Sequence, residues 1–251
     1  MGIESPYVPW GIHPEILEAA RAAGPVTADA SPVPPGDGGD GGGTVPRHPP
    51  RERLVKLIFP GGFIGHRKPL RPILEAFSRT RNPDLRLLVK AQVERKTLAD
   101  ARDAAEADPR LTLLLADQSM EEHYATFGEY DVCLVPSRWE GLGLPHYEAM
   151  AFGMPVITND DPPMNEIVEH ERNGLLVPSH QIGTAQSGIP AMDPDVDALA
   201  EAIERIADDE LRARLSAGAR EVCEERAWKH TVAGLGELVE QAQAARAGTR
   251  S

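Results

Sequence analysis

The sequence is short of positive charge and of long apolar runs, and each shortage excludes a class of protein. Its 251 residues carry 26 Lys and Arg against 39 Asp and Glu, a formal net charge of -13. Nucleic-acid phosphates and anionic lipid surfaces both require clustered positive charge, so we expect neither as a partner. No apolar run approaches the roughly 20 residues that a membrane-spanning helix needs.

Cysteine and the common catalytic motifs are also scarce. The two cysteines, Cys133 and Cys223, form neither a disulfide framework nor a metal motif. The eight histidines include no HExxH pair and no zinc-finger spacing, and no GxSxG motif is present to carry a hydrolase nucleophile. The first residues lack the basic and apolar regions of a secretory signal. We therefore expect a reduced, cytoplasmic protein without a metal site or a bound cofactor.

The chain divides into three segments by composition. Residues 1–23 contain one short amphipathic helical pattern after a turn that holds Pro and Gly. Residues 24–53 are rich in Gly and Pro and cannot bury enough apolar surface to offset their ordering entropy, so a flexible linker is predicted. Residues 54–251 have the composition of a single folded domain.

From Leu54 onward, short apolar runs alternate with helical patterns. Six such pairs, which begin with LVKLIFPGG, LRLLVKA, LTLLLAD, DVCLVPS, MPVITND and GLLVPS, follow one another at spacings of roughly 20 to 30 residues. The runs are continuously apolar, which indicates strands buried on both faces, and the rhythm is typical of βαβ crossovers. The sequence predicts a three-layer α/β domain with a six-stranded parallel sheet.

A basic loop, PGGFIGHRKP, follows the first predicted strand. In a parallel α/β sheet, ligands bind beyond the carboxyl ends of the strands, where this loop would lie. Gly61, Gly62 and Gly65 allow a ligand to approach the backbone closely. Arg67 and Lys68 place cations near a helix N-terminus, against the helix dipole. A phosphate would relieve that conflict, and a solvated basic turn is the alternative.

The stretch PSRWEGLGLPHYEAM, after the fourth predicted strand, carries two glutamates. Glu140 would stand at the carboxyl end of the strand, and GLG would present free amides at a helix start, an anion site that needs no side chain. We expect Glu148 in the first helical turn, where the dipole keeps its carboxylate ionised. The pair could flank a ligand with phosphate and sugar hydroxyls, or belong to an ordinary surface loop and helix. His146 is expected to be a partly exposed helix residue.

A third loop, within residues 158–177, places two prolines and Asn165 before a helix whose first turn holds Glu166. An ordinary helix with a side-chain N-cap explains this pattern.

The stretches PSRWEGLGLPHYEAMAFGMPVITND and NEIVEHERNGLLVP closely resemble the donor-binding half of retaining glycosyltransferases with the GT-B fold. The resemblance is to the large family 4 of nucleotide-sugar-dependent enzymes, whose hallmark is two glutamates separated by seven residues. VKLIFPGGFIGHRKPL is similar to the first strand and lysine-bearing loop of that family, and AWKHTVAGL to the turn before its last helices. The resemblance implies a Rossmann-like, nucleotide-sugar-binding domain over residues 54–251, the C-terminal half of a GT-B fold.

The resemblance also implies a role for each matching residue. Glu148 would bind the ribose hydroxyls of the nucleotide, and Glu140 would contact the donor sugar or orient the reacting centre. Lys68 would neutralise the leaving diphosphate in place of a divalent metal, so Glu140 and Lys68 are the predicted catalytic residues. The sugar or diphosphate would be held by the backbone amides of Gly141, Leu142 and Gly143.

Two departures from the family pattern affect the predicted site and its partners. Many relatives carry an arginine where this chain has Gly62, so a second diphosphate cation is either missing or supplied by Arg67. A complete enzyme has two halves, and VPWGIHPE resembles the hinge between them, so residues 1–23 are interpreted as hinge and short helix. The acceptor-binding half would belong to the same longer protein or to a separate subunit, and it would make any peripheral contact with the inner membrane.

The predicted function is transfer of a sugar, with retention, from a UDP- or GDP-sugar to an unidentified glycan, lipid-linked or small-molecule acceptor. A non-catalytic nucleotide-sugar-binding module that lacks the acceptor domain is the alternative.

Overall fold

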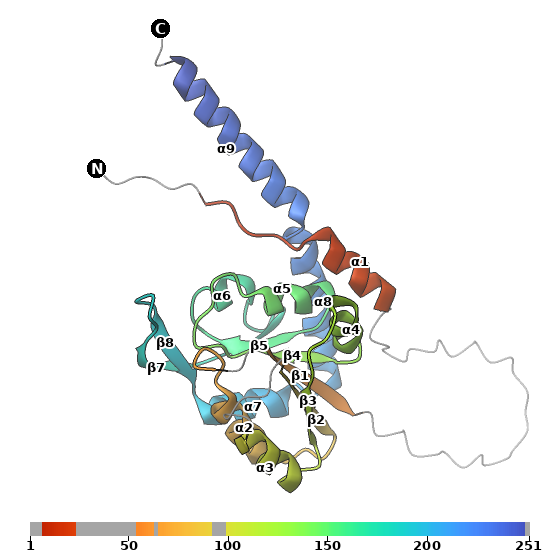
Figure 1. Cartoon of the computed structure of the whole chain (residues 1–251). Helices are drawn as coiled ribbons and strands as arrows, with labels where there is room; N and C mark the ends of the chain where they lie inside the picture. The colour runs from red at the N-terminus through yellow and green to blue at the C-terminus, as the bar shows by residue number, and fades with distance from the viewer. Residues whose placement is uncertain (1–6, 24–53, 63–64, 92–98, 249–251) are drawn as a thin grey trace, which may run out of the picture.

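Six short parallel strands form one sheet at the centre of the molecule (Figure 1). The computed structural model describes residues 7–23, 54–62, 65–91 and 99–248. The strands are β1 (Val55–Gly62), β2 (Leu85–Ala91), β3 (Leu111–Leu115), β4 (Val132–Leu134), β5 (Val156–Asn159) and β6 (Gly174–Val177). The residues of β1, β2, β4 and β5 are almost all buried, as expected for strands covered on both faces. The predicted six-stranded parallel sheet is confirmed.

The order of the strands places β1 and β4 side by side. The sheet runs β3-β2-β1-β4-β5-β6, so the chain moves outward from β1 to β3, returns to the centre and moves outward in the other direction. Leu57 of β1 pairs with Val132 of β4, and Ile58 pairs with Cys133. Where the direction reverses in this way, the loops after the two central strands diverge and leave a crevice at the carboxyl edge of the sheet.

Helices cover both faces of the sheet. One face is covered by α2 (Leu70–Arg79), α3 (Ala99–Ala107) and α7 (Val196–Arg205), and the other by α1 (Pro14–Ala23), α4 (Met120–Phe127), α5 (Leu144–Ala151) and α8 (Asp209–Glu225). The short α6 (Met164–Ile167) follows β5, and α9 (Trp228–Gly248) extends away from the sheet (Figure 1). Across the part of the chain that the structure describes, no helix is long and apolar enough to cross a bilayer.

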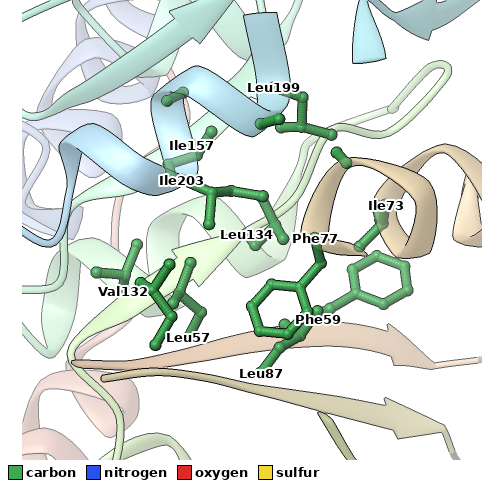
Figure 2. Close-up of a cluster of buried hydrophobic side chains, with 14 of the residues drawn as sticks. Leu57, Phe59, Ile73, Phe77, Leu87, Val132, Leu134, Ile157, Leu199 and Ile203 are labelled. Carbon is green, nitrogen blue, oxygen red and sulfur yellow. The ribbon is translucent and has the colours of Figure 1, made fainter. Parts of the chain in front are cut away.

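Alternate residues of β1 contribute to two hydrophobic clusters, one on each face of the sheet. Leu57 and Phe59 belong to the cluster that includes Ile73 and Phe77 of α2 (Figure 2). Ile58 belongs to the cluster on the opposite face. Full burial of one such side chain contributes about 1.5–3 kcal/mol. The central strand, whose carboxyl end leads into the basic loop, is therefore held from both faces.

The start of the described chain is attached to the turn before α9. Ile12 forms a parallel bridge with Ala227, and the rings of Trp10 and Trp228 meet edge to face with centroids 5.0 Å apart. From there α1 packs against α4 and α5. A short helix is thus present where one was expected, while its interpretation as part of a hinge stays a prediction. The predicted linker, residues 24–53, lies outside the described residues.

An antiparallel hairpin that the sequence did not predict follows β6. It consists of β7 (Ser179–Thr184) and β8 (Pro190–Pro194). Most of β7 is polar and exposed, and two prolines bound β8, so neither strand carries the apolar pattern by which strands are recognised. The hairpin is tied to the loop after β4, because Arg138 forms an ion pair with Asp193 and the Met192 amide donates to the Arg138 carbonyl at 3.0 Å.

The helix of the third loop begins two residues earlier than expected and has no side-chain N-cap. It starts at Met164, after Pro163, which forms no capping hydrogen bond. Asn165 lies inside the helix, and its Nδ2 donates to Asp160 Oδ1 at 3.0 Å. The predicted cap is therefore wrong, because the amide side chain closes the preceding loop instead. Glu166 is in the first turn, as predicted.

Because α8 packs closely against the loop before β6, alanine substitutions at two helical glycines, one in α8 and one in α9, should change the free energy of unfolding in opposite directions. A Cβ added at Gly218 of α8 would lie 1.9 Å from the carbonyl oxygen of Arg172, whereas a Cβ at Gly236 of α9 would meet nothing within 4 Å. We expect Gly218→Ala to lower the free energy of unfolding by about 1–3 kcal/mol, because backbone must move. The matched control Gly236→Ala should stabilise α9 by about 0.5–1 kcal/mol through helix propensity. Urea unfolding of both variants checks this, and equal stability of Gly218→Ala and wild type would contradict the packing.

Candidate functional site

A cleft of about 480 Å³ opens where the loops after β1 and β4 meet α4 and α5. Its walls include the eight predicted catalytic and substrate-binding residues, which are Gly62, Arg67, Lys68, Glu140, Gly141, Leu142, Gly143 and Glu148, whereas Gly65 of the basic loop does not line it. Eight further residues complete the lining: Pro60, Gly61, Lys90, Gln118, Met120, His123, Leu144 and Pro145. Asn165 and Glu166 of the third loop are not among them. The structure thus gathers the predicted site residues in one place, and their individual roles stay predictions.

Lys68 and Glu140 form a buried ion pair in the wall of this cleft. Lys68 Nζ donates to Glu140 Oε1 at 2.7 Å and to Ser137 Oγ at 2.8 Å, and the two charged residues are only 5% and 6% exposed. Arg67 Nη1 donates to the other carboxylate oxygen, Oε2, at 3.2 Å. The backbone joins the same two loops, because the Arg138 amide donates to the Arg67 carbonyl at 2.9 Å. One carboxylate therefore links the loop after β1 to the loop after β4.

The ion pair also decides the protonation state of Glu140. Burial by itself would raise the pKa of this carboxyl group, but the Lys68 ammonium, hydrogen bonds from Lys68 and Ser137, and the charge of Arg67 together lower the pKa below its ordinary value. Glu140 is therefore ionised at neutral pH. Its negative charge balances the cations that precede α2, so the conflict between those cations and the helix dipole is relieved within the protein.

The glycine loop at residues 141–143 presents backbone amides to the cleft. Gly143, the N-cap of α5, has φ 71° and ψ 43°, the left-handed conformation that glycine adopts without strain. Among the described residues, no acceptor is bonded to the amides of Gly141, Leu142 or Gly143. Free N–H groups at a helix start carry partial positive charge, so this wall attracts an anion without using a charged side chain.

Glu148 does not lie in the first turn of α5, and that expectation is wrong. Because Gly143 is the N-cap, the helix begins at Leu144, so Glu148 is the fifth helical residue and stands in the second turn. The influence of the dipole falls off within the first turn. The side chain that meets the carboxylate is instead His123 of α4, whose Nε2 is 3.4 Å from Glu148 Oε2. Lys90 of β2 contacts the other nitrogen of the same ring, Nδ1, through its Nζ.

Sequence reasoning missed four polar residues of the site, Lys90, Gln118, His123 and Ser137. A signal existed for Lys90, because it stands near the carboxyl end of the second strand, the edge at which parallel sheets bind ligands. Ser137 likewise follows the fourth strand. His123 had no such signal, since its partner Glu148 is 25 residues further along the chain on a different helix.

His146 is fully buried beneath the glycine loop, so the expectation of a partly exposed residue is wrong. Its Nδ1 lies 3.0 Å from the Gly143 carbonyl oxygen, and its Nε2 lies 3.1 Å from Thr158 Oγ1 on β5. Burial lowers the pKa of His146 to about 4, although the Glu140 carboxylate opposes this shift. The ring is therefore neutral at neutral pH, and it connects the start of α5 to the sheet.

Comparison with solved structures places this fold in a class. The C-terminal domain of a group 1 glycosyl transferase, LpcC of Francisella tularensis, superposes with a TM-score of 0.56 at 20% identity, over 68% of this chain and 85% of that one. The pneumococcal O-GlcNAc transferase GtfA, in complex with UDP and GlcNAc, superposes with a TM-score of 0.60 at 20% identity, over 76% of this chain and 37% of that one. The domain has the fold of the C-terminal half of a GT-B glycosyltransferase, as the sequence predicted.

The sequence itself matches the family described as glycosyl transferases group 1 over residues 48–222, well over half of the chain. The chain therefore belongs to that family. The D-inositol 3-phosphate glycosyltransferase of Saccharomonospora viridis is 34% identical over 140 residues, which are 55% of this chain and 29% of that protein. The chain spans well under half the length of the curated relatives that it matches.

The buried neutral His146 predicts a specific loss of stability in acid. The unfolded histidine binds a proton near pH 6.5, whereas the folded one resists protonation down to about pH 4, so the stabilising contribution is complete above the unfolded pKa and is lost as the pH falls from about 6.5 to about 4. The linked free energy is about 3 kcal/mol. In urea unfolding, the stability of wild type relative to His146→Gln should fall by about 2–3 kcal/mol between about pH 7.5 and about pH 4.5.

The exposed His180 of β7 provides the control. The difference between wild type and His180→Gln should be within about 0.5 kcal/mol at neutral pH, as expected for a substitution of an exposed side chain. A pH-independent difference between wild type and His146→Gln would contradict a buried neutral ring.

Proposed function

We propose that this chain is the nucleotide-sugar-binding domain of a retaining glycosyltransferase, which transfers a sugar from a UDP- or GDP-sugar to an acceptor hydroxyl. One observation carries the proposal. A single cleft combines a buried lysine, a half-exposed arginine, free amides at a helix start and a separate carboxylate, which together match a ligand with a diphosphate at one end and hydroxyls at the other.

The diphosphate fits the cationic side of the cleft. The free amides of the glycine loop and the ammonium of Lys68 supply positive charge from two directions, and the half-exposed Arg67 adds a third. A diphosphate that enters would share Lys68 and Arg67 with Glu140, and the absence of a side chain at Gly62 leaves room for it. Charge neutralisation by these groups would stabilise the leaving diphosphate as the glycosidic bond breaks.

Glu148 lies apart from these cations and would accept hydrogen bonds from the hydroxyls of the ribose. Its carboxylate faces the cleft between α4 and α5, with 14% of the side chain exposed. The base would then lie toward the side chains of Gln118 and Met120, which line the same cleft. The complex of GtfA with UDP and GlcNAc supports a uridine nucleotide as one candidate donor.

Glu140 is poorly suited to attack the sugar. Its two oxygens are engaged by Lys68 and Arg67, and its lowered pKa makes it a weak base. We assign it instead to contacts with the donor sugar. In the proposed reaction the bond between the anomeric carbon and the diphosphate oxygen breaks, and its electron pair leaves with the nucleoside diphosphate. The acceptor oxygen bonds to the same face of the sugar, while its proton passes to a diphosphate oxygen.

The acceptor would be bound by a second wall that faces this cleft. Transfer with retention requires the acceptor hydroxyl to lie next to the donor sugar. The curated relatives are more than twice as long as the part of them that this chain matches. We propose that the second wall comes from an acceptor domain of the same protein or of a separate subunit. Without that wall the chain would bind the nucleotide-sugar and not transfer it.

Nucleotide binding tests the proposal directly. UDP or GDP should bind the chain in calorimetry, and Glu148→Ala should weaken binding about tenfold or more, because hydrogen bonds to a charged acceptor contribute about 1.5–3 kcal/mol. Glu166→Ala is the matched control, since Glu166 is an exposed glutamate outside the cleft, and it should leave affinity unchanged. Absence of binding by either nucleotide at millimolar concentration would refute the proposed function.

Binding should not depend on a divalent metal. The cleft offers Lys68, Arg67 and backbone amides to the diphosphate, and the described residues include no group of three or more His, Cys, Asp or Glu side chains placed to hold a metal ion. A ligand that binds the native state raises the melting temperature by mass action. We therefore expect the thermal shift produced by a UDP- or GDP-sugar to survive EDTA. Its disappearance on chelation, with recovery on adding Mg²⁺, would contradict the proposed role of Lys68.

A further inference from the structure

Three polar side chains from three different elements meet in the wall of the cleft. They are Lys90 of β2, His123 of α4 and Glu148 of α5, and all three line the cleft. Lys90 Nζ contacts His123 Nδ1, and His123 Nε2 lies 3.4 Å from Glu148 Oε2. Lys90 is only 5% exposed, so its ammonium has little access to solvent. None of the roles assigned above uses Lys90 or His123.

The contacts fix which ring nitrogen carries the proton. A lysine ammonium has three donors and no acceptor, so the Nδ1 atom that it meets must accept. A neutral imidazole then carries its single proton on Nε2, the atom that faces Glu148. His123 therefore accepts from Lys90 and donates to one oxygen of the carboxylate. In this arrangement Lys90 is positive, His123 is neutral and Glu148 is negative.

The ring of His123 is also held from its sides. Its centroid lies 4.8 Å from that of the buried Phe127 and 5.4 Å from that of Tyr124. The helix that carries it begins with a reciprocal capping box, in which Ser119 and Glu122 each bond the backbone of the other. The imidazole is thus fixed in orientation before any ligand enters.

Electrostatics favour the same arrangement. Burial lowers the pKa of Lys90, and the negative charge of Glu148 opposes that shift. The carboxylate therefore stabilises the charged form of the buried lysine, and the histidine connects the two. With its Oε2 atom engaged by His123, the carboxylate is held in one rotational state, in which each oxygen still has a lone pair free.

From this arrangement we propose that Lys90 and His123 are positioning residues that aim the Glu148 carboxylate at two neighbouring hydroxyls, and so select ribonucleoside over 2′-deoxyribonucleoside diphosphates. The inference rests on the proposed function, since it specifies how that site recognises its nucleotide. A carboxylate that is free to rotate can turn so that it still bonds the one hydroxyl of a deoxyribose. A carboxylate held in one orientation leaves one of its oxygens without a donor when a hydroxyl is missing. Sites built in that way reject the analogue that lacks the group.

The test is the ratio of dissociation constants for dUDP and UDP, or for dGDP and GDP if the chain prefers guanine. We expect wild type to bind the ribonucleotide about tenfold more tightly, the equivalent of one lost hydrogen bond to a charged acceptor. His123→Leu should bring the ratio to within about threefold of unity. His123→Gln should restore much of the ratio, because the glutamine amide keeps one acceptor and one donor. His180→Gln, on the exposed hairpin, should leave the ratio unchanged.

The ratio separates positioning from a merely structural role, because a loosened site would weaken both nucleotides equally. Should His123→Leu melt below the assay temperature, Lys90→Met provides the second variant, and it should also lower the ratio. If wild type binds neither nucleotide, the proposed function fails and the inference fails with it. If wild type binds but shows no ribose preference, or if His123→Leu or Lys90→Met keeps the full ratio, only the inference is overturned.

Discussion

The Lys68–Glu140 ion pair is the interaction on which the cleft depends. Two charges buried to this degree cost several kcal/mol to desolvate, and they are tolerated because they meet each other, the Ser137 hydroxyl and the Arg67 guanidinium. The pair can form because the sheet reverses direction between β1 and β4, so loops that are some 70 residues apart in the chain end side by side. The cations proposed to bind a diphosphate therefore bond Glu140 in its absence, and in this way they hold the two walls of the cleft together.

Much of this architecture could be predicted from the sequence. Six continuously apolar runs, each followed by a helical pattern, specify a parallel sheet, and the rule that ligands bind at the carboxyl ends of its strands identifies the basic loop and the loop that carries Glu140. Those inferences need only local patterns and one topological rule. The family resemblance then assigned different roles to Glu140 and Glu148, whereas the local sequence pattern alone does not distinguish the two residues.

What the sequence could not predict depends on contacts between distant elements. The position of Glu148 in its helix follows from the left-handed backbone of Gly143, and the proline at Pro145 does not reveal where the helix starts. The burial of His146 follows from how α5 sits on β5, and the link from Lys90 to Glu148 needs three elements in place at once. The periodicity of one segment contains no information about contacts between side chains of different helices and strands.

The places at which Ala23 and Leu54 lie have a consequence for engineering. A Cβ at Gly128 would touch Ala23, and Lys56, just after Leu54, exchanges hydrogen bonds with Asp131. Ala23 and the start of β1 therefore both approach the loop that precedes β4, at the amino-terminal edge of the sheet, while the cleft opens at the carboxyl edge. A fluorescent reporter inserted between Ala23 and Leu54 would therefore be attached at the edge of the sheet opposite the cleft, and it would leave the order of the strands intact.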